Sequence, residues 1–219
     1  LNRYGIRTRE IGLNWAKADS RFDLSKEVNE PNKVGYVVEI DPLNPNSTPK
    51  KHTALGRFKH ENAELVISKD GKIIVYMGDD ERGEYLYKYV SNKSINEVKD
   101  KSTLLSNGNL YVAKFNDNFT GEWLLLDTQT TGLSSKAEVC IFTRLAASKV
   151  GATTMDRPEW IASNPKINEV CCCLTNNKNR GIKTNKGGDK VDVDKVNPRK
   201  NNKYGPVSYT HLRAHETLG

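Results

Sequence analysis

Short apolar runs separated by turn residues divide most of the chain into predicted strands. Residues 36–40 ("YVVEI") alternate between apolar and polar positions and stop at Asp41-Pro42, as expected for a strand that ends in a turn. Asp70-Gly71 stands between two apolar runs and is a strong hairpin signal. The fold class is therefore predicted to be mainly β, with further strands at 54–58, 63–68, 72–78, 85–90, 109–115, 121–127, 159–163 and 169–177.

One inserted helix is predicted in the second half of the chain. Ser135 and Glu138 have the spacing of a capping box, and Gly151 stands where a left-handed C-terminal residue is expected. Residues 1–35 scatter aromatic side chains among charges without a clean period, so long loops are expected there. The predicted apolar face of the helix consists of Val139, Phe142, Leu145 and Ala146.

Two segments, 63–80 and 158–177, follow the same order of residue types. Glu64 in the first and Glu159 in the second precede a short apolar stretch, a turn and a second apolar strand that ends in two polar residues. Repeats of strand, turn and strand are typical of propeller blades, although a β-sandwich would also supply hairpins. The repeated position of the glutamate favours a propeller.

The stretch "YMGDDERGEYLYKYV" places four acids and one arginine where one predicted strand ends and the next begins. On extended backbone Arg82 and Glu84 would share a face, about 7 Å apart along the strand. An arginine fork matches two phosphate oxygens, and carboxylates suit hard metal ions. The alternative is a solvated turn in which the two side chains form a surface ion pair contributing under about 1 kcal/mol.

Two other acidic segments could converge with this turn at the mouth of a channel. "GRFKHENAEL" contains Glu61, and "MDRPEW" contains Glu159 beside Arg157, which Pro158 is expected to hold extended. Carboxylates that converge need a cation or a proton to offset their repulsion. The sequence therefore raises the hypothesis of a metal and phosphate site built from Arg82, Glu84, Glu61 and Glu159.

Composition changes this picture little. The chain has 219 residues, 36% of them hydrophobic, and a mean hydropathy of −0.68, which indicates a modest core with many loops. Its net charge of +7 comes mostly from residues 178–203, which carry nine Lys/Arg and three Asp. Because this segment lacks aromatic side chains that could stack on bases, a solvated basic loop is the favoured interpretation. Polyanion binding is the alternative.

Neither the cysteines nor residues 207–219 are expected to contribute to a functional site. Cys171, Cys172 and Cys173 are consecutive, so they cannot form a zinc clamp and are interpreted, with Cys140, as buried filler. No run of 18 apolar residues exists. Residues 207–219 ("VSYTHLRAHETLG") resemble a translated sequencing adapter, so residues 1–206 are taken as one domain and His211 and His215 are excluded from it.

Several motifs together resemble the PhoX family of alkaline phosphatases, in order from Asn2 to Gly205. These are "NEPNKVGYVVEIDP", "ALGRFKHENAEL", "VYMGDDERGEYLYKYV", "TRLAASKVGATTMDRPEWIA", "LTNNKNRG" and "NPRKNNKYG". The resemblance implies a six-bladed β-propeller with added helices and loops, and a metal-dependent phosphomonoesterase site holding calcium and iron at one channel mouth. It also implies export by the twin-arginine route to the periplasm or the outside of the cell.

The same resemblance assigns roles to residues of this chain. It implies that Arg82 clamps the substrate phosphate and that Glu84 ligates metal, with Glu61 and Glu159 as further metal candidates and Asn176 as a second substrate contact. The family's amino-terminal half, with a metal-ligating Cys and Asp, precedes anything in this sequence. The chain is therefore expected to be a carboxy-terminal fragment, inactive alone, and part of a monomer that acts on small phosphate esters.

Two other function classes stay open at this point. A non-catalytic propeller used for binding would lack tightly held metals and turnover of p-nitrophenyl phosphate at alkaline pH. A polyanion-binding protein would show salt-sensitive DNA binding that depends on residues 178–203. Neither a membrane nor a nucleic acid is the expected partner.

Overall fold

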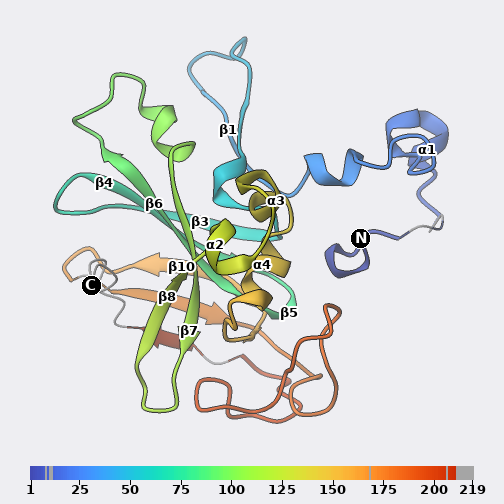
Figure 1. The fold of residues 1–219 in the computed structure, drawn as a ribbon, viewed down its shortest axis with the longest axis vertical. Helices are drawn as coiled ribbons and strands as arrows, with labels where there is room; N and C mark the ends of the chain where they lie inside the picture. The colour runs from blue at the N-terminus through green and yellow to red at the C-terminus, as the bar shows by residue number, and fades with distance from the viewer. Residues whose placement is uncertain (8, 10–11, 168, 206, 211–219) are drawn as a thin grey trace.

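The computed structural model describes residues 1–7, 9, 12–167, 169–205 and 207–210. The fold is mainly β, and its largest element is a five-stranded antiparallel sheet that lies between short helices on one face and a second sheet on the other (Figure 1). Its strand order is β3-β4-β6-β7-β8, formed by β3 (His60–Ile67), β4 (Lys72–Asp79), β6 (Leu86–Ser94), β7 (Gly108–Phe115) and β8 (Gly121–Leu125).

Three smaller sheets complete the β structure. The three-stranded sheet has the order β10-β11-β12, and two pairs of short strands, β1-β2 and β5-β9, stand apart from it. Strand β12 lies in the segment 207–219 that resembles a translated sequencing adapter, and residues 211–219 of that segment lie outside the described residues. The bounds are β1 (Val37–Glu39), β2 (Lys50–His52), β5 (Arg82–Glu84), β9 (Met155–Asp156), β10 (Pro158–Ser163), β11 (Val170–Leu174) and β12 (Val207–Thr210).

Strand β4 lacks a polar face because both of its faces are buried. Val75 and Met77 pack in the cluster on the helical side, whereas Ile74 and Tyr76 pack in the cluster that contains β10 and β11. A strand covered on both sides reads as a continuous apolar run, which explains "KIIVYM". Cys172 joins the second cluster as the predicted strand filler, whereas Cys173 is exposed, so the prediction of a buried side chain is wrong for Cys173.

Both predicted hairpins form, but the two glutamates that suggested a repeat have different surroundings. β3 pairs with β4 and β10 pairs with β11, both antiparallel. Glu64 lies within β3 and accepts hydrogen bonds from the backbone and hydroxyl of Ser163 on β10, so it joins the two hairpins. Glu159 instead pairs with Arg157, its neighbour two positions earlier. The described residues show a mainly β fold and no closed propeller.

The predicted single helix is wrong in its extent, because the segment from Ser135 to Gly151 forms two short helices, and a further short helix precedes it. The three helices are α2 (Thr128–Thr131), α3 (Lys136–Ile141) and α4 (Thr143–Lys149). The break falls at Phe142, whose φ of −105° and ψ of 40° are not helical. The Thr143 hydroxyl donates toward the carbonyls of Val139 and Cys140, a contact that bends helices.

The two ends of the predicted helix behave as expected, but its predicted apolar face does not. The Ser135 hydroxyl accepts the backbone N–H of Glu138, and Gly151 has the left-handed φ of 74°. Phe142 and Leu145 remain 37% and 43% exposed, because the break rotates them away from the core that holds Val139 and Ala146. In Figure 1 the three helices lie together over the middle of the large sheet.

The described part of residues 1–35 is loop-rich, as predicted, but one predicted strand after it is wrong. Residues 54–58 are not a strand, because a 3-10 turn and Gly56 at φ 82° redirect the backbone. The buried Arg57 that follows donates to the carbonyls of Pro31 and Ile141. The short helices here and near β7 are η1 (Asn2–Tyr4), α1 (Trp15–Ala18), η2 (Ser20–Phe22), η3 (Glu30–Lys33), η4 (Thr53–Leu55) and η5 (Lys101–Leu105).

The basic segment 178–203 is attached to the fold, so the interpretation as a solvated loop is wrong for its inner residues. Arg180 is fully buried, and its Nη2 lies 2.8 Å from Oδ1 of the equally buried Asp156. Asn185 and Val191 are buried as well. The segment runs past β5 as an irregular covering, with Asn185 hydrogen-bonded to the carbonyl of Gly83 (Figure 1). Over the described residues, no helix has the length and apolarity needed to cross a membrane.

Candidate functional site

The charged turn follows β4 and bends sharply at Gly83. Gly83 has a left-handed φ of 75°, and the pairing of β5 with β9 shifts register between Arg82 and Glu84. A Cβ atom on Gly83 would lie 2.7 Å from side-chain atoms of Asn185 and Val191, so the position requires glycine. The regular strand assumed for Arg82 and Glu84 is therefore wrong, and the two side chains contact different residues.

Asp79, the first acid of the turn, forms a buried ion pair with Arg144 of α4. Nη2 of Arg144 lies 2.6 Å from Oδ1 of Asp79, and neither side chain is exposed. Burial raises the pKa of Asp79, and the adjacent guanidinium opposes this effect. Removal of either partner would leave the other charge buried without compensation, so this pair holds the turn against the helices.

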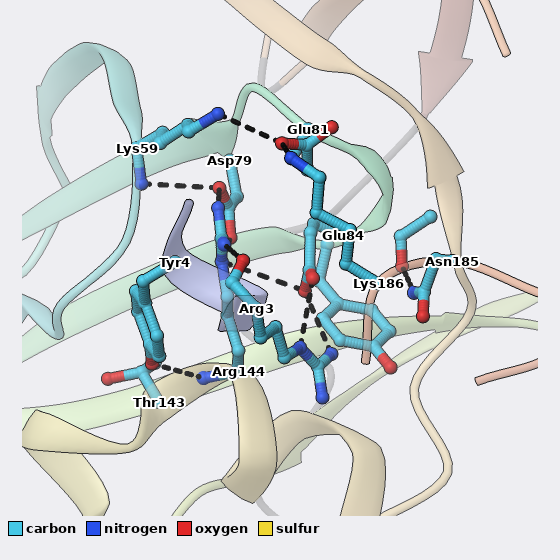
Figure 2. Close-up of polar contacts among 12 residues, drawn as sticks. Arg3, Tyr4, Lys59, Asp79, Glu81, Glu84, Thr143, Arg144, Asn185 and Lys186 are labelled. Atoms are coloured by element: carbon cyan, nitrogen blue, oxygen red, sulfur yellow. Dashed lines mark hydrogen bonds and ion pairs between the residues drawn. The ribbon is translucent and has the colours of Figure 1, made fainter. Parts of the chain in front are cut away.

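Glu84 is also fully buried and is held by Arg3. Nε and Nη2 of Arg3 each donate to a different oxygen of the Glu84 carboxylate at 2.9 Å (Figure 2). Nε of Arg144 lies 3.8 Å from the same carboxylate. Burial raises the pKa of Glu84, while the hydrogen bonds from Arg3 lower it. Two carboxylates of the turn are thus neutralised by two guanidinium groups.

Glu81 is neutralised by lysines. Its Oε2 accepts from Nζ of Lys59 at 2.9 Å and from Nζ of Lys186 at 2.8 Å, contacts drawn in Figure 2. Its Oε1 accepts the backbone N–H of Arg82. Partial burial raises the pKa of Glu81, but the two ammonium groups outweigh this and bring it to about 2.

Arg82 differs from the other arginines around it. Its Nη2 donates to Oδ1 of Asn176 at 3.0 Å, which brings together the two residues predicted to contact substrate. Its Nε is buried without a hydrogen-bond partner, and within the described ranges no carboxylate forms an ion pair with it. Arg82 therefore keeps a half-buried positive charge and at least one unused donor.

Arg157 forms an ion pair with Asp80, the remaining acid of the turn. Its Nε lies 2.7 Å from Oδ1 of Asp80, and its Nη2 lies 3.2 Å from Oε1 of Glu159. The extended backbone predicted for Arg157 is wrong, since its φ is 58°. This left-handed geometry is costly for a residue other than glycine, and the ion pairs with Asp80 and Glu159 accompany it.

The three predicted metal ligands do not form one set in this part of the chain. Glu84 is buried against Arg3, Glu159 is bound by Arg157 and by the hydroxyl of Thr175, and Glu61 is exposed on β3. Among the residues with described positions, no group of three or more His, Cys, Asp or Glu side chains could hold a metal ion. The donors present do not by themselves fit a metal centre.

Sequence reasoning missed the residues that neutralise the turn. Arg3 lies 81 positions before Glu84, and Lys186 lies 105 positions after Glu81, so no local pattern links them. Arg144 could have been noticed, because it is a charged residue next to the apolar residues of "RLAA" in the predicted helix, and a charge buried in a helix needs a partner. Lys186 belonged to the segment interpreted as solvated.

Comparisons with known proteins agree with the motifs. The sequence profile of the family described as "Alkaline phosphatase PhoX" matches residues 1–217. A search of curated proteins finds no match. A solved structure of Pseudomonas fluorescens PhoX, in complex with vanadate as a transition-state analogue, is 47% identical with a TM-score of 0.84. The similarity covers 94% of this chain and 37% of that protein, so the chain spans little more than a third of that relative's length.

Proposed function

The chain belongs to the PhoX family of alkaline phosphatases, and from this premise we propose that it is part of a metal-dependent enzyme that hydrolyses phosphate monoesters. The observation that carries the proposal is the state of Arg82. Its guanidinium is half-buried, anchored by Asn176, and has no carboxylate partner among the described residues. An arginine in this state is suited to bind an oxyanion.

The charges around Arg82 support a site for an anion. Asp79, Asp80, Glu81 and Glu84 each have a basic partner, so they do not cancel the positive charge of Arg82. In phosphoryl transfer, negative charge is spread over three equatorial oxygens, and preorganised donors stabilise it. Arg82 would donate to these oxygens, and Asn176 would fix the orientation of its guanidinium.

Calcium and iron belong to the proposal through the family alone, and Glu61, Glu84 and Glu159 are the ligands proposed for them. The described residues lack a complete donor set, so further ligands are required, and Glu84 would have to give up Arg3 to take part. Elemental analysis of the full-length protein tests this assignment. Glu61→Gln and Glu159→Gln should each lower bound metal, and unchanged metal content in both would reject these ligands.

The wider architecture is likewise proposed from the family. We expect residues 1–206 to form part of a six-bladed β-propeller in a monomeric enzyme of the periplasm or the extracellular space. Residues 207–219 are proposed to be a non-native tail, and the 219-residue chain is proposed to be inactive alone. Phosphatase activity of the isolated chain, with calcium and iron supplied, would contradict the last point.

Replacement of Arg82 in the full-length protein tests the central assignment. Arg82→Ala should lower kcat/KM for p-nitrophenyl phosphate by about 100- to 1,000-fold, the usual cost of removing a preorganised donor. Arg21→Ala removes an exposed arginine whose ion pair is with the nearby Asp19, and it should leave turnover unchanged. Normal activity of Arg82→Ala would remove Arg82 from the site.

A further inference from the structure

Residues 185–191, here called the strap, lie directly over the charged turn. The side-chain amide of Asn185 donates to the carbonyl of Gly83 at 2.6 Å, and Lys186 contacts Glu81. Asp189 accepts from Nη2 of Arg3 at 3.0 Å. Three strap residues therefore contact the turn or Arg3, and the carbonyl of Lys190 also accepts a bond from the hydroxyl of Thr154.

The strap and Arg3 are in close contact through a glycine. A Cβ atom on Gly187 would lie 2.6 Å from the guanidinium carbon of Arg3, so only glycine lets the strap approach this closely. Beneath this contact the Glu84 carboxylate has no exposed surface. A ligand that reaches Glu84 must therefore displace the strap or Arg3.

Arg3 is the group that joins the strap to the buried acid. One guanidinium donates to both oxygens of Glu84, to Oδ2 of Asp189 and to the hydroxyl of Ser148. Asp189 also accepts from the hydroxyl groups of Tyr85 and Ser148. Figure 2 shows the guanidinium of Arg3 directed at Glu84. This cluster connects the start of the chain, the charged turn, α4 and the strap.

The contacts of Lys186 and Asn185 hold the strap less strongly than those of Arg3. Lys186 is 47% exposed at its side chain, and such ion pairs contribute little in water. The bond from Asn185 is between neutral groups, whereas the bonds of Arg3 are charge-assisted and mostly buried. The strap also contains two consecutive glycines, Gly187 and Gly188, and no regular secondary structure, so local opening is inexpensive.

We propose that Arg3 is a latch, a positioning residue whose guanidinium ties Glu84 to Asp189 and so holds the strap closed over the charged turn. Release of this guanidinium opens the strap and exposes Glu84. The proposal goes beyond the phosphatase assignment, since it concerns access to the turn and holds whichever ligand enters.

Hydrogen exchange and carboxyl labelling test the latch in the full-length protein, kept free of metal with a chelator so that Glu84 stays bound to Arg3. In Arg3→Met, the strap amides should exchange about tenfold faster or more, because each 1.4 kcal/mol of lost interaction is tenfold. Glu84, protected in the parent protein, should react with a water-soluble carbodiimide and glycine ethyl ester. Amides of β4 and β6 should keep their protection, which separates strap opening from unfolding. Arg7→Met, a nearby exposed arginine, is the matched control and should change neither readout.

Two further variants distinguish a latch from a generally structural residue. In Arg3→Gly, millimolar guanidinium chloride should restore strap protection, and the same concentration of sodium chloride should not. Gly187→Ala should loosen the strap although Arg3 is intact, and Lys183→Ala, at an exposed neighbouring position, should not. Parent-like exchange and labelling in both Arg3→Met and Gly187→Ala would overturn the proposal. No turnover is measured, so its failure is separate from failure of the phosphatase assignment.

Discussion

Arg144 and Asp79 form an ion pair from which water is excluded. Nε of Arg144 lies 2.7 Å from Oδ2 of Asp79, Nη2 lies 2.6 Å from Oδ1, and both side chains have zero exposure. The pair connects the end of β4 to α4, 65 positions later. It therefore sets the position of the charged turn relative to the helices.

Arg144→Met should destabilise the chain by about 3–5 kcal/mol, because it leaves the carboxylate of Asp79 buried without a partner. Urea denaturation at pH 7 measures the loss. The double variant Arg144→Met/Asp79→Asn removes the unpaired charge and should recover a large part of the stability. Equal stability of the single and double variants would show that the pair is not coupled.

Lys88 should make the free energy of unfolding depend on pH in the alkaline range. Its ammonium lies 4.6 Å from the ring centroid of Trp123 and 5.3 Å from that of Tyr111, and no carboxylate among the described residues pairs with it. Burial lowers the pKa of Lys88 from 10.5 to about 8. The folded state prefers the neutral amine, so the free energy of unfolding should rise as pH increases from about 8 to 10.5.

Lys88→Met should remove this rise. At pH 7 the variant should be more stable by on the order of 2 kcal/mol, after allowance for the lost cation–π contacts. Above pH 10 the difference should be small. Denaturation curves at several pH values measure the effect, and parallel pH profiles for the parent and the variant would contradict it.

Gly83→Ala and Gly71→Ala form a matched pair. Both glycines have a left-handed φ, 75° and 81°, so both substitutions carry a similar backbone cost of about 1–3 kcal/mol. At Gly71 the nearest atom to the new methyl group is 3.2 Å away, whereas at Gly83 the distance is 2.7 Å. Gly83→Ala should therefore cost more in thermal denaturation. Equal losses would show that the strap adapts to the methyl group.

Asn176 should affect phosphatase activity by holding the guanidinium of Arg82 in position. In the full-length protein, Asn176→Ala should lower kcat/KM by about tenfold, the loss expected for one hydrogen bond to a charged group. Asn176→Asp should lower it further, because a carboxylate 3.0 Å from Arg82 would compete with the phosphate for the guanidinium. Steady-state kinetics with p-nitrophenyl phosphate measures both. An Asn176→Asp variant more active than Asn176→Ala would reject this role.

The strands were predictable because burial follows a local period. The run before Asp79 is apolar because β4 is covered on both faces, and the hairpin at Asp70-Gly71 follows from turn chemistry. The break of the helix at Phe142 was not predictable from apolar spacing, because it depends on how the Thr143 hydroxyl bonds to the preceding turn. Local propensity therefore located most elements but not their interruptions.

The candidate site was only partly accessible from sequence. The pairing of Arg82 with Asn176 joins two residues that family motifs marked, 94 positions apart. No motif indicated the pairing of Glu84 with Arg3, because an ion pair between distant segments produces no periodic pattern in the sequence. The left-handed conformation of Gly83 also invalidated the alternation on which the predicted Arg82–Glu84 face depended.

Because alternate side chains of β4 belong to two different apolar clusters, the layers of the molecule share one strand. Neither layer can lose β4 without exposing the interior of the other, so the two should melt in one cooperative transition rather than in sequence. Substitutions along this strand should therefore be the least tolerated in the chain, and its amides should be the last to exchange with solvent.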